Sequence, residues 1–206
     1  MASVAEWVEG ARPRTLPAAI APVVAGLGVT GYTGTDLSAM HGAVAALLAL
    51  LVALALQIGV NYFNDYSDGV RGTDSVRVGP VRLVGQGLAP ASQVKRAALL
   101  SLGTAAVLGT ALVLVSRQWI LLPIGVAAVL AAYGYTGGKH PYGYLGLGDV
   151  FVFIFFGPVA VCGTTLVTGG GLWPVAVLTS IAIGILTVHI LVANNLRDRA
   201  LDERAG

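Results

Sequence analysis

The stretch AVAALLALLVALALQIGVNYFNDYSDGVRGTD, residues 43–74, contains the abrupt change of polarity around which the chain is organised. Its first part, Ala43 to Val60, is an uninterrupted apolar run, long enough to cross a bilayer as a helix of about 17–20 residues. Its second part is rich in Asn and Asp. If the helix continues through this boundary, these polar residues lie at a membrane surface.

The polar part places oxygen-bearing side chains at helical spacing. Residues four apart share a helix face, so Asn61 lies one turn before Asp65. Asn64 stands in the same relation to Asp68. Such carboxylates suit a hard cation such as Mg²⁺, which is usually held by one or two carboxylates and the phosphates of a substrate. Three arginines that could grip phosphate oxygens follow: Arg71, Arg77 and Arg82. The stretch predicts a diphosphate site at the membrane face.

The composition is that of an integral membrane protein. Hydrophobic residues make up 56% of the 206 residues and charged residues 11%, which is outside the range of soluble domains. Six apolar stretches can span a bilayer, the fourth being the shortest: Thr15–Tyr32, Ala43–Val60, Ala97–Val115, Ile120–Tyr135, Val150–Val167 and Val175–Val192. We predict an all-α fold, a polytopic membrane helix bundle in a lipid bilayer. A net charge of +2 does not indicate nucleic acid as a partner.

The charged residues are distributed very unevenly over the predicted loops. With six spans, eleven of the twelve lysines and arginines fall on one side, and only Arg117 falls on the other. The positive-inside rule makes the first side cytoplasmic. Nine of the ten acidic residues lie there as well, with Asp36 alone opposite. We therefore predict a multi-pass protein of the cell membrane whose functional surface faces the cytoplasm.

The end of the sixth span repeats the pattern that follows the second. Asn194, Asp198 and Asp202 are four residues apart and form a stripe on one helix face. Spans two and six are an even number of crossings apart, so both stripes emerge on the same side. They can then face each other as two clusters of metal ligands.

Between the fourth and fifth spans, Gly and Tyr alternate from Tyr133 to Asp149. These tyrosines suit an aromatic belt at the membrane interface. They also lie beside Lys139, on the side of the predicted metal motif, where Tyr135 and Tyr142 could form the wall of a site.

Two such clusters beside a membrane cavity could hold Mg²⁺ on a diphosphate whose hydrocarbon tail lies in the bilayer. The metal would stabilise the charge on departing pyrophosphate. Aromatic faces could then stabilise the resulting allylic cation until an aromatic acceptor captures it.

Several stretches resemble the UbiA superfamily of intramembrane prenyltransferases, and within it the branch that acts on 1,4-dihydroxy-2-naphthoate. They are ARPRTLPAAIAP from Ala11, NDYSDGVRGTD from Asn64, RVGPVRLV from Arg77, YTGG from Tyr135, PYGYLGLGD from Pro141 and NNLRD from Asn194. The resemblance implies transfer of a polyprenyl group from a polyprenyl diphosphate to 1,4-dihydroxy-2-naphthoate in menaquinone biosynthesis. The ring carboxylate and pyrophosphate would be lost.

The resemblance also implies roles for individual residues. The first Mg²⁺ cluster would be formed by Asn64, Asp68 and Asp74, and the second by Asp198 and Asp202 with help from Asn194. Asp65 would be either a metal ligand or a base for a phenolic proton. Candidates for binding pyrophosphate or the acceptor's carboxylate are Arg71, Arg82 and Lys139, and candidates for the wall that stabilises the cation are Tyr135 and Tyr142.

Two features depart from the superfamily pattern. Asp74 follows Asp68 by six residues, whereas many members space these aspartates four apart; the naphthoate branch shares the longer spacing. The chain also ends at Gly206, soon after the second stripe, while complete relatives continue with about three more helices. We expect residues 1–206 to form a single transmembrane domain, incomplete at its C-terminus, with six of about nine helices.

Two other classes share part of the pattern. Asp65-Tyr-Ser-Asp68-Gly69 matches the start of the motif of CDP-alcohol phosphatidyltransferases, although the rest of that motif does not follow. A cation-coupled transporter would need carboxylates at or within the membrane, and His189 in the sixth span would be its best relay candidate.

Overall fold

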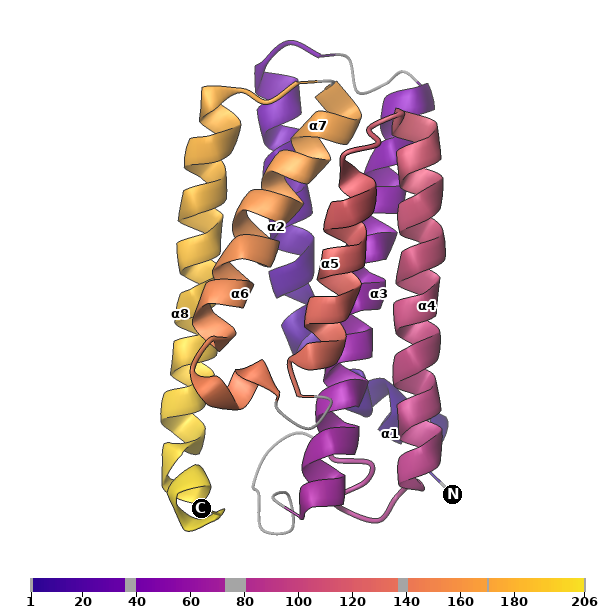
Figure 1. The fold of residues 1–206 in the computed structure, drawn as a ribbon, viewed down its shortest axis with the longest axis vertical. Coiled ribbons are helices and arrows are strands. Elements are labelled where there is room, and N and C mark those ends of the chain that lie inside the picture. The colour runs from indigo at the N-terminus through magenta and orange to yellow at the C-terminus, as the bar shows by residue number, and fades with distance from the viewer. Residues whose placement is uncertain (1, 36–39, 73–80, 137–140, 170, 206) are drawn as a thin grey trace.

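The computed structural model describes residues 2–35, 40–72, 81–136, 141–169 and 171–205, which form helices and no strands. In chain order the elements are α1 (Val4–Gly10), η1 (Pro13–Thr15), α2 (Leu16–Tyr32), α3 (Met40–Arg71), α4 (Ala91–Ser116), α5 (Leu121–Gly134), η2 (Tyr142–Leu145), α6 (Gly148–Ile154), η3 (Phe155–Cys162), α7 (Gly163–Gly169) and α8 (Pro174–Ala205). The long helices run along one axis, and both chain ends lie at the same end of the bundle (Figure 1). We call this the polar end, because α3 also finishes there. The all-α membrane bundle predicted from the sequence is confirmed.

Helix α3 continues well past the apolar run, which is the condition under which its Asn and Asp residues share helix faces. It has 32 residues, and at about 1.5 Å per residue it is about 48 Å long, compared with about 30 Å for the hydrocarbon core. Its last turns, beginning at Asn61, therefore extend beyond the core at the polar end. This extension carries the first Asn/Asp stripe.

Within the described ranges, five helical segments are long and apolar enough to cross a membrane: Val4–Tyr32, Met40–Arg71, Ala91–Ser116, Gly148–Gly169 and Pro174–Leu196. The fourth predicted span is the shorter helix α5, with 14 residues. Its length of about 21 Å is less than the hydrocarbon thickness. It nevertheless lies within the bundle, in front of α3 in Figure 1. The chain is thus a multi-pass membrane protein whose helix bundle also contains a short apolar helix.

The fifth predicted span is one continuous segment that changes helix type in its middle. α6 and α7 are α-helical, whereas η3 between them is π-helical and contains Pro158. Proline has no N–H and its ring crowds the preceding turn, so a widened turn is the local response. The widened turn accommodates Pro158 without a break in the span.

Small residues allow this segment to approach α8 and α2 closely. A Cβ added to Gly157 would lie 2.6 Å from the carbonyl oxygen of Ser180, and one added to Gly26 would lie 2.7 Å from Cβ of Thr164. The hydroxyl groups of Thr30 and Thr168 also hydrogen-bond across α2 and α7 at 2.9 Å. Close packing of small residues and interhelical hydrogen bonds hold helices together where lipid provides no hydrophobic drive.

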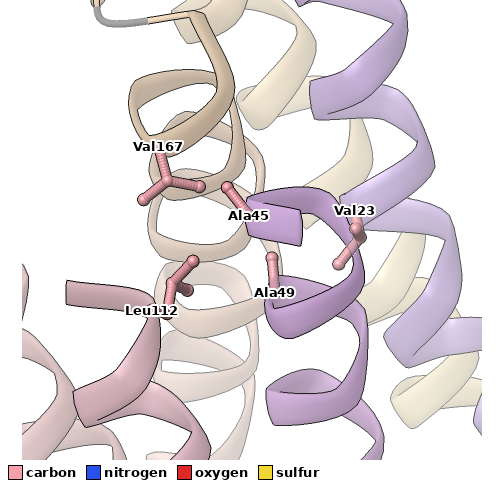
Figure 2. Close-up of a cluster of buried hydrophobic side chains, with 5 residues drawn as sticks. All are labelled: Val23, Ala45, Ala49, Leu112 and Val167. Carbon is pink, nitrogen blue, oxygen red and sulfur yellow. The ribbon is translucent and has the colours of Figure 1, made fainter. Parts of the chain in front are cut away.

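Far from the polar end, a buried cluster joins four helices (Figure 2). Ala45 and Ala49 on α3 contact side chains of the neighbouring helices, namely Val23 on α2, Leu112 on α4 and Val167 on α7. Two alanines on the central helix leave room for larger side chains from three sides.

The contact at Gly157 predicts a stability effect. In Gly157→Ala the new methyl group meets a backbone carbonyl that cannot move aside, so we expect a loss of about 1–3 kcal/mol, as for other overpacked sites. Thermal unfolding in detergent would measure it. The matched control is Gly103→Ala on α4, where an added Cβ meets nothing within 4 Å. Equal melting temperatures for the two variants would contradict the close packing of η3 on α8.

Candidate active site

A cavity of about 570 Å³ lies among the helices, lined by residues of α2, α3, α4, α5, α6, η3, α7 and α8. Most of its lining is apolar and includes Val23, Ala49 and Leu112 of the buried cluster. Polar side chains line it toward the polar end: Arg12, Thr15, Gln57, Asn61, Asn64, Tyr135, Tyr142 and Asn194. A molecule with a polar head and a long apolar tail fits a cavity whose lining is polar at one end and apolar elsewhere.

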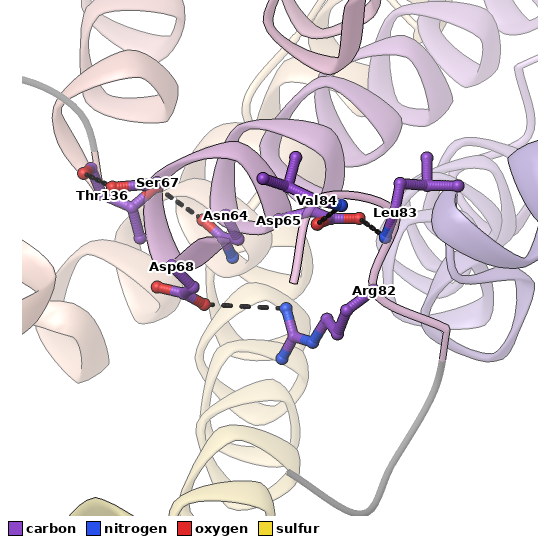
Figure 3. Close-up of polar contacts among 8 residues, drawn as sticks. All are labelled: Asn64, Asp65, Ser67, Asp68, Arg82, Leu83, Val84 and Thr136. Atoms are coloured by element: carbon purple, nitrogen blue, oxygen red, sulfur yellow. Dashed lines mark hydrogen bonds and ion pairs between the residues drawn. The ribbon is translucent and has the colours of Figure 1, made fainter. Parts of the chain in front are cut away.

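Asn64 is positioned by the segment that follows α5. Its side-chain oxygen accepts a 2.8 Å hydrogen bond from the hydroxyl of Thr136. Ser67, one turn along, donates to the backbone carbonyl of Thr136 at 2.6 Å. Figure 3 shows both contacts on one side of α3. The two bonds hold Thr136 against α3 and orient Asn64 at the cavity.

Asp65 points to a different side of α3, toward the segment that precedes α4 (Figure 3). Its two carboxylate oxygens accept hydrogen bonds from the backbone N–H of Leu83, at 2.8 Å, and of Val84, at 3.1 Å. The residue is fully buried. A buried carboxylate needs such partners, because an unpaired one is costly to remove from water. Asp65 therefore anchors the segment from Val81 onward, and it does not line the cavity.

This anchored segment brings Arg82 to the first Asn/Asp stripe. Arg82 and Asp68 are both buried, and Nη1 of Arg82 lies 3.6 Å from a carboxylate oxygen of Asp68. Asp68 lies one turn after Asn64, on the same face of α3. An arginine is thus held directly beside the carboxylate that the sequence predicted as a metal ligand.

Residues 11–15 form the next part of the polar lining. The side-chain amide of Asn61 donates to the carbonyl of Ala11 at 2.8 Å and to the hydroxyl of Thr15 at 2.9 Å. Between them, Arg12 has a φ of 54°, in the left-handed region that non-glycine residues seldom adopt. Backbone strain of this kind is often found where a side chain must be aimed at a site. Arg12 lines the cavity.

Aromatic rings form a ladder along one side of the cavity. The rings of Tyr135 and Tyr142 meet edge to face with centroids 5.6 Å apart, and Tyr142 stacks on Phe151 at 4.1 Å. Phe155 continues the ladder, 6.2 Å from Phe151. All four residues line the cavity. The ladder places several aromatic rings beside the same cavity.

The Tyr142 phenol lies in a buried setting beside Tyr135. Burial raises the pKa of Tyr142 above its usual value, with a smaller contribution from Tyr135. The hydroxyl of Tyr142 donates a 2.8 Å hydrogen bond to the carbonyl of Ala131. This bond fixes the ring at the end of α5.

The structure places the other residues predicted for the site as follows. Asn194 on α8 lines the same cavity as Asn64, so one member of each stripe borders a common space. Arg71 lines a different pocket, on another face of α3. Asp74 and Lys139 lie outside the described residues, as do the side chains of Asp198 and Asp202. In the part of the chain that is described, no three His, Cys, Asp or Glu side chains gather closely enough to hold a metal.

Sequence reasoning did not identify three features of the site. Arg12 lies in the stretch ARPRTLPAAIAP and Thr136 in the stretch YTGG, both of which carry the family resemblance, but no role in the site was predicted for either residue. No role in the site was predicted for Phe151 or Phe155, and only the fold shows that they line the cavity.

Comparison with known proteins places this architecture in a family. Residues 19–206 match the UbiA prenyltransferase family. Over its whole length the chain is 54% identical to 1,4-dihydroxy-2-naphthoate octaprenyltransferase of Mycobacterium tuberculosis, of which it covers 68%. Over 97% of its length it is 37% identical to the protein of the same name from Escherichia coli, of which it covers 65%.

A vertebrate protein is also similar. The chain is 30% identical over 98% of its length to UbiA prenyltransferase domain-containing protein 1 of Gallus gallus, of which it covers 60%. No solved structure matches the chain. The chain thus spans about two thirds of the length of these relatives. Since the family match covers most of the chain and the similarity extends over nearly all of it, the chain belongs to the UbiA prenyltransferase family.

Proposed function

We propose that the chain transfers a polyprenyl group from a polyprenyl diphosphate to 1,4-dihydroxy-2-naphthoate in menaquinone biosynthesis. The observation that carries the proposal is the cavity, which joins an Asn- and Arg-lined polar end to a long apolar interior with an aromatic ladder. The similarity to proteins named 1,4-dihydroxy-2-naphthoate octaprenyltransferase supports the choice of acceptor.

The polar end of the cavity would hold the diphosphate. Asn64 and Asp68 offer an amide and a carboxylate oxygen one turn apart, a donor set that suits a divalent cation, which we propose to be Mg²⁺. Asp74 would complete this group, and Asn194, Asp198 and Asp202 would form a second. When bound, the metal would neutralise the charge that develops on departing pyrophosphate. Arg12 and Arg82 supply guanidinium groups at the same end, which suit phosphate oxygens.

The apolar interior would receive the prenyl tail. During the reaction the bond from the first prenyl carbon to the diphosphate oxygen breaks, and its electrons leave with pyrophosphate. The faces of Tyr135, Tyr142 and Phe151 would stabilise the allylic cation through their quadrupoles. The ring carbon of the acceptor that carries the carboxylate forms the new bond. The bond between this ring carbon and the carboxylate carbon then breaks. Carbon dioxide departs, and the electrons of the broken bond restore the aromatic ring.

Several further assignments belong to the same proposal. Lys139 is a candidate for binding an anionic group of substrate or product, whereas Arg71, which lines the separate pocket, is not assigned to this site. The polar end would face the cytoplasm, in agreement with the lysine and arginine bias. Residues 1–206 would act as one transmembrane domain, which further helices complete.

The alternatives are not favoured. In a CDP-alcohol phosphatidyltransferase, Asp65 and Asp68 would act together, yet here Asp65 is occupied by two backbone N–H groups and points away from Asp68 (Figure 3). For a transporter, His189 would be the relay, but within the described part of the chain its ring hydrogen-bonds to the carbonyl of Ile185 on its own helix. The family match also argues against both.

The first test is prenyl transfer in membranes supplied with labelled polyprenyl diphosphate, 1,4-dihydroxy-2-naphthoate and Mg²⁺. A chimera joins residues 1–206 to the C-terminal third of the M. tuberculosis relative, and the chain alone is assayed beside it. We expect the chimera to form product, EDTA to abolish it, and Asp68→Asn to reduce the rate by about 10²-fold or more, as for loss of a charged group that acts on the transition state. A folded chimera without product, in an assay where the parent relative is active, would contradict the proposed function.

The second prediction separates an anchoring role of Asp65 from a role as base or ligand. In Asp65→Asn the amide can accept only one of the two backbone N–H bonds, so we expect a loss of about 1–3 kcal/mol in the free energy of unfolding. Thermal unfolding measures this, with exposed Glu9→Gln as the control. Any remaining activity should keep the wild-type pH profile. If the melting temperature were unchanged and the rate instead changed on the acidic side of the pH–rate profile, Asp65 would be assigned as the base.

The third prediction concerns the aromatic ladder. Tyr142→Phe keeps the ring but removes the hydrogen bond to Ala131, whereas Tyr142→Leu removes the ring face. Because a desolvated cation–π contact contributes about 1–2 kcal/mol, the Leu variant should lower kcat by about tenfold while the Phe variant stays near wild type. Equal rates for the two variants, or equal losses, would rule out stabilisation of the cation by this ring.

A further inference from the structure

A second pocket, of about 300 Å³, lies between the last turns of α3, the first turn of α4 and the end of α5. It shares no lining residue with the central cavity. On α3 the central cavity is bordered by Asn61 and Asn64, whereas this pocket is bordered by Phe63 and Tyr66. Helical periodicity puts these pairs on different faces of α3. The proposed prenyl transfer makes no use of this space.

The charges that line the pocket are positive. Its described lining residues include Arg71 and Lys95 and no carboxylate. The ammonium group of Lys95 lies 5.4 Å from the centre of the Tyr66 ring, so a cation–π contact holds it at the pocket. The pocket is therefore suited to an anion, and its two basic groups come from two different helices.

A connected aromatic wall gives the pocket its shape. The rings of Tyr66 and Phe63 meet edge to face at 5.8 Å, and Phe63 meets Tyr133 of α5 in the same way at 5.0 Å. Phe63 is almost fully buried, whereas Tyr133 is 42% exposed. The wall thus runs from the interior of the bundle to its surface, where tyrosines commonly lie at the level of lipid headgroups.

The rim of the pocket lies next to apolar surface. Val70 is exposed on α3, and Leu99 is exposed on α4, one turn from Lys95 toward the middle of the bundle. The direction from Lys95 to Leu99 leads from the polar end into the part of the helix that crosses the membrane. A ligand with its anionic group at Lys95 can therefore extend an apolar chain along Leu99.

We propose that this pocket binds the phosphate headgroup of an anionic phospholipid, with the acyl chains lying along the exposed side chains of α3 and α4. Basic pockets between membrane helices at the cytoplasmic side suit such headgroups. A soluble phosphate would satisfy the same cations. It would gain nothing from the tyrosine at the interface or from the apolar rim, and these two features favour the lipid.

The test uses the purified chain with equal amounts of phosphatidylglycerol and phosphatidylcholine, and native mass spectrometry to count the retained lipids. Wild type should retain phosphatidylglycerol in preference. Lys95→Gln should lower this preference about fivefold, the effect of about one basic residue near an anionic headgroup. Arg96→Gln is the matched control, because Arg96 is the exposed neighbouring cation on α4 and does not line the pocket. It should leave the preference unchanged.

Two outcomes would overturn the proposal. Equal losses in Lys95→Gln and Arg96→Gln would show that surface charge in general attracts the lipid. Displacement of phosphatidylglycerol by free glycerol phosphate at concentrations similar to those of the lipid would assign the pocket to a small soluble anion. Neither measurement depends on prenyl transfer, so the lipid site stands or falls independently of the proposed function.

Discussion

The paired hydrogen bonds from the backbone of Leu83 and Val84 to the buried carboxylate of Asp65 organise the polar end of the bundle. A charged group in this position has to be compensated by polar partners, and two N–H groups from consecutive residues can do so only if that segment lies in one orientation. The orientation in turn places Arg82 beside Asp68. One buried carboxylate thus determines the surroundings of another that lies at the proposed site.

Helix α3 gives each of its faces a different task at this end. One face presents Asn61 and Asn64 to the cavity, a second directs Asp65 to the segment before α4, and a third forms the wall of the basic pocket. This division is possible because the helix extends beyond the hydrocarbon core and can be surrounded by polar segments. Thr136 connects two of these faces, since it lines the basic pocket and donates to Asn64.

Much of the fold could be predicted from the sequence. The apolar runs corresponded to the helices, and the structure meets the condition under which Asn61, Asn64, Asp65 and Asp68 lie at helical spacing, because α3 continues to Arg71. The π-helical turn at Pro158 and the shortness of α5 were less accessible. A proline indicates that the helix must change its hydrogen bonding locally, but it does not indicate which type of turn results. Hydropathy does not show where polar segments pack against the end of a helix.

For the candidate site the sequence by itself determined which residues are one turn apart and which ends of the spans share a side of the membrane. Helical periodicity and the counting of crossings require nothing more. Only the tertiary structure decided what each side chain contacts. Asp65 accepts hydrogen bonds from two backbone N–H groups, Arg71 lines a separate pocket, and Arg12 lines the central cavity. The physical reason is that a helix fixes the angles between its own side chains, whereas their partners come from segments far away in the chain. The positions of those segments are set by packing and by the hydrogen bonds of buried polar groups.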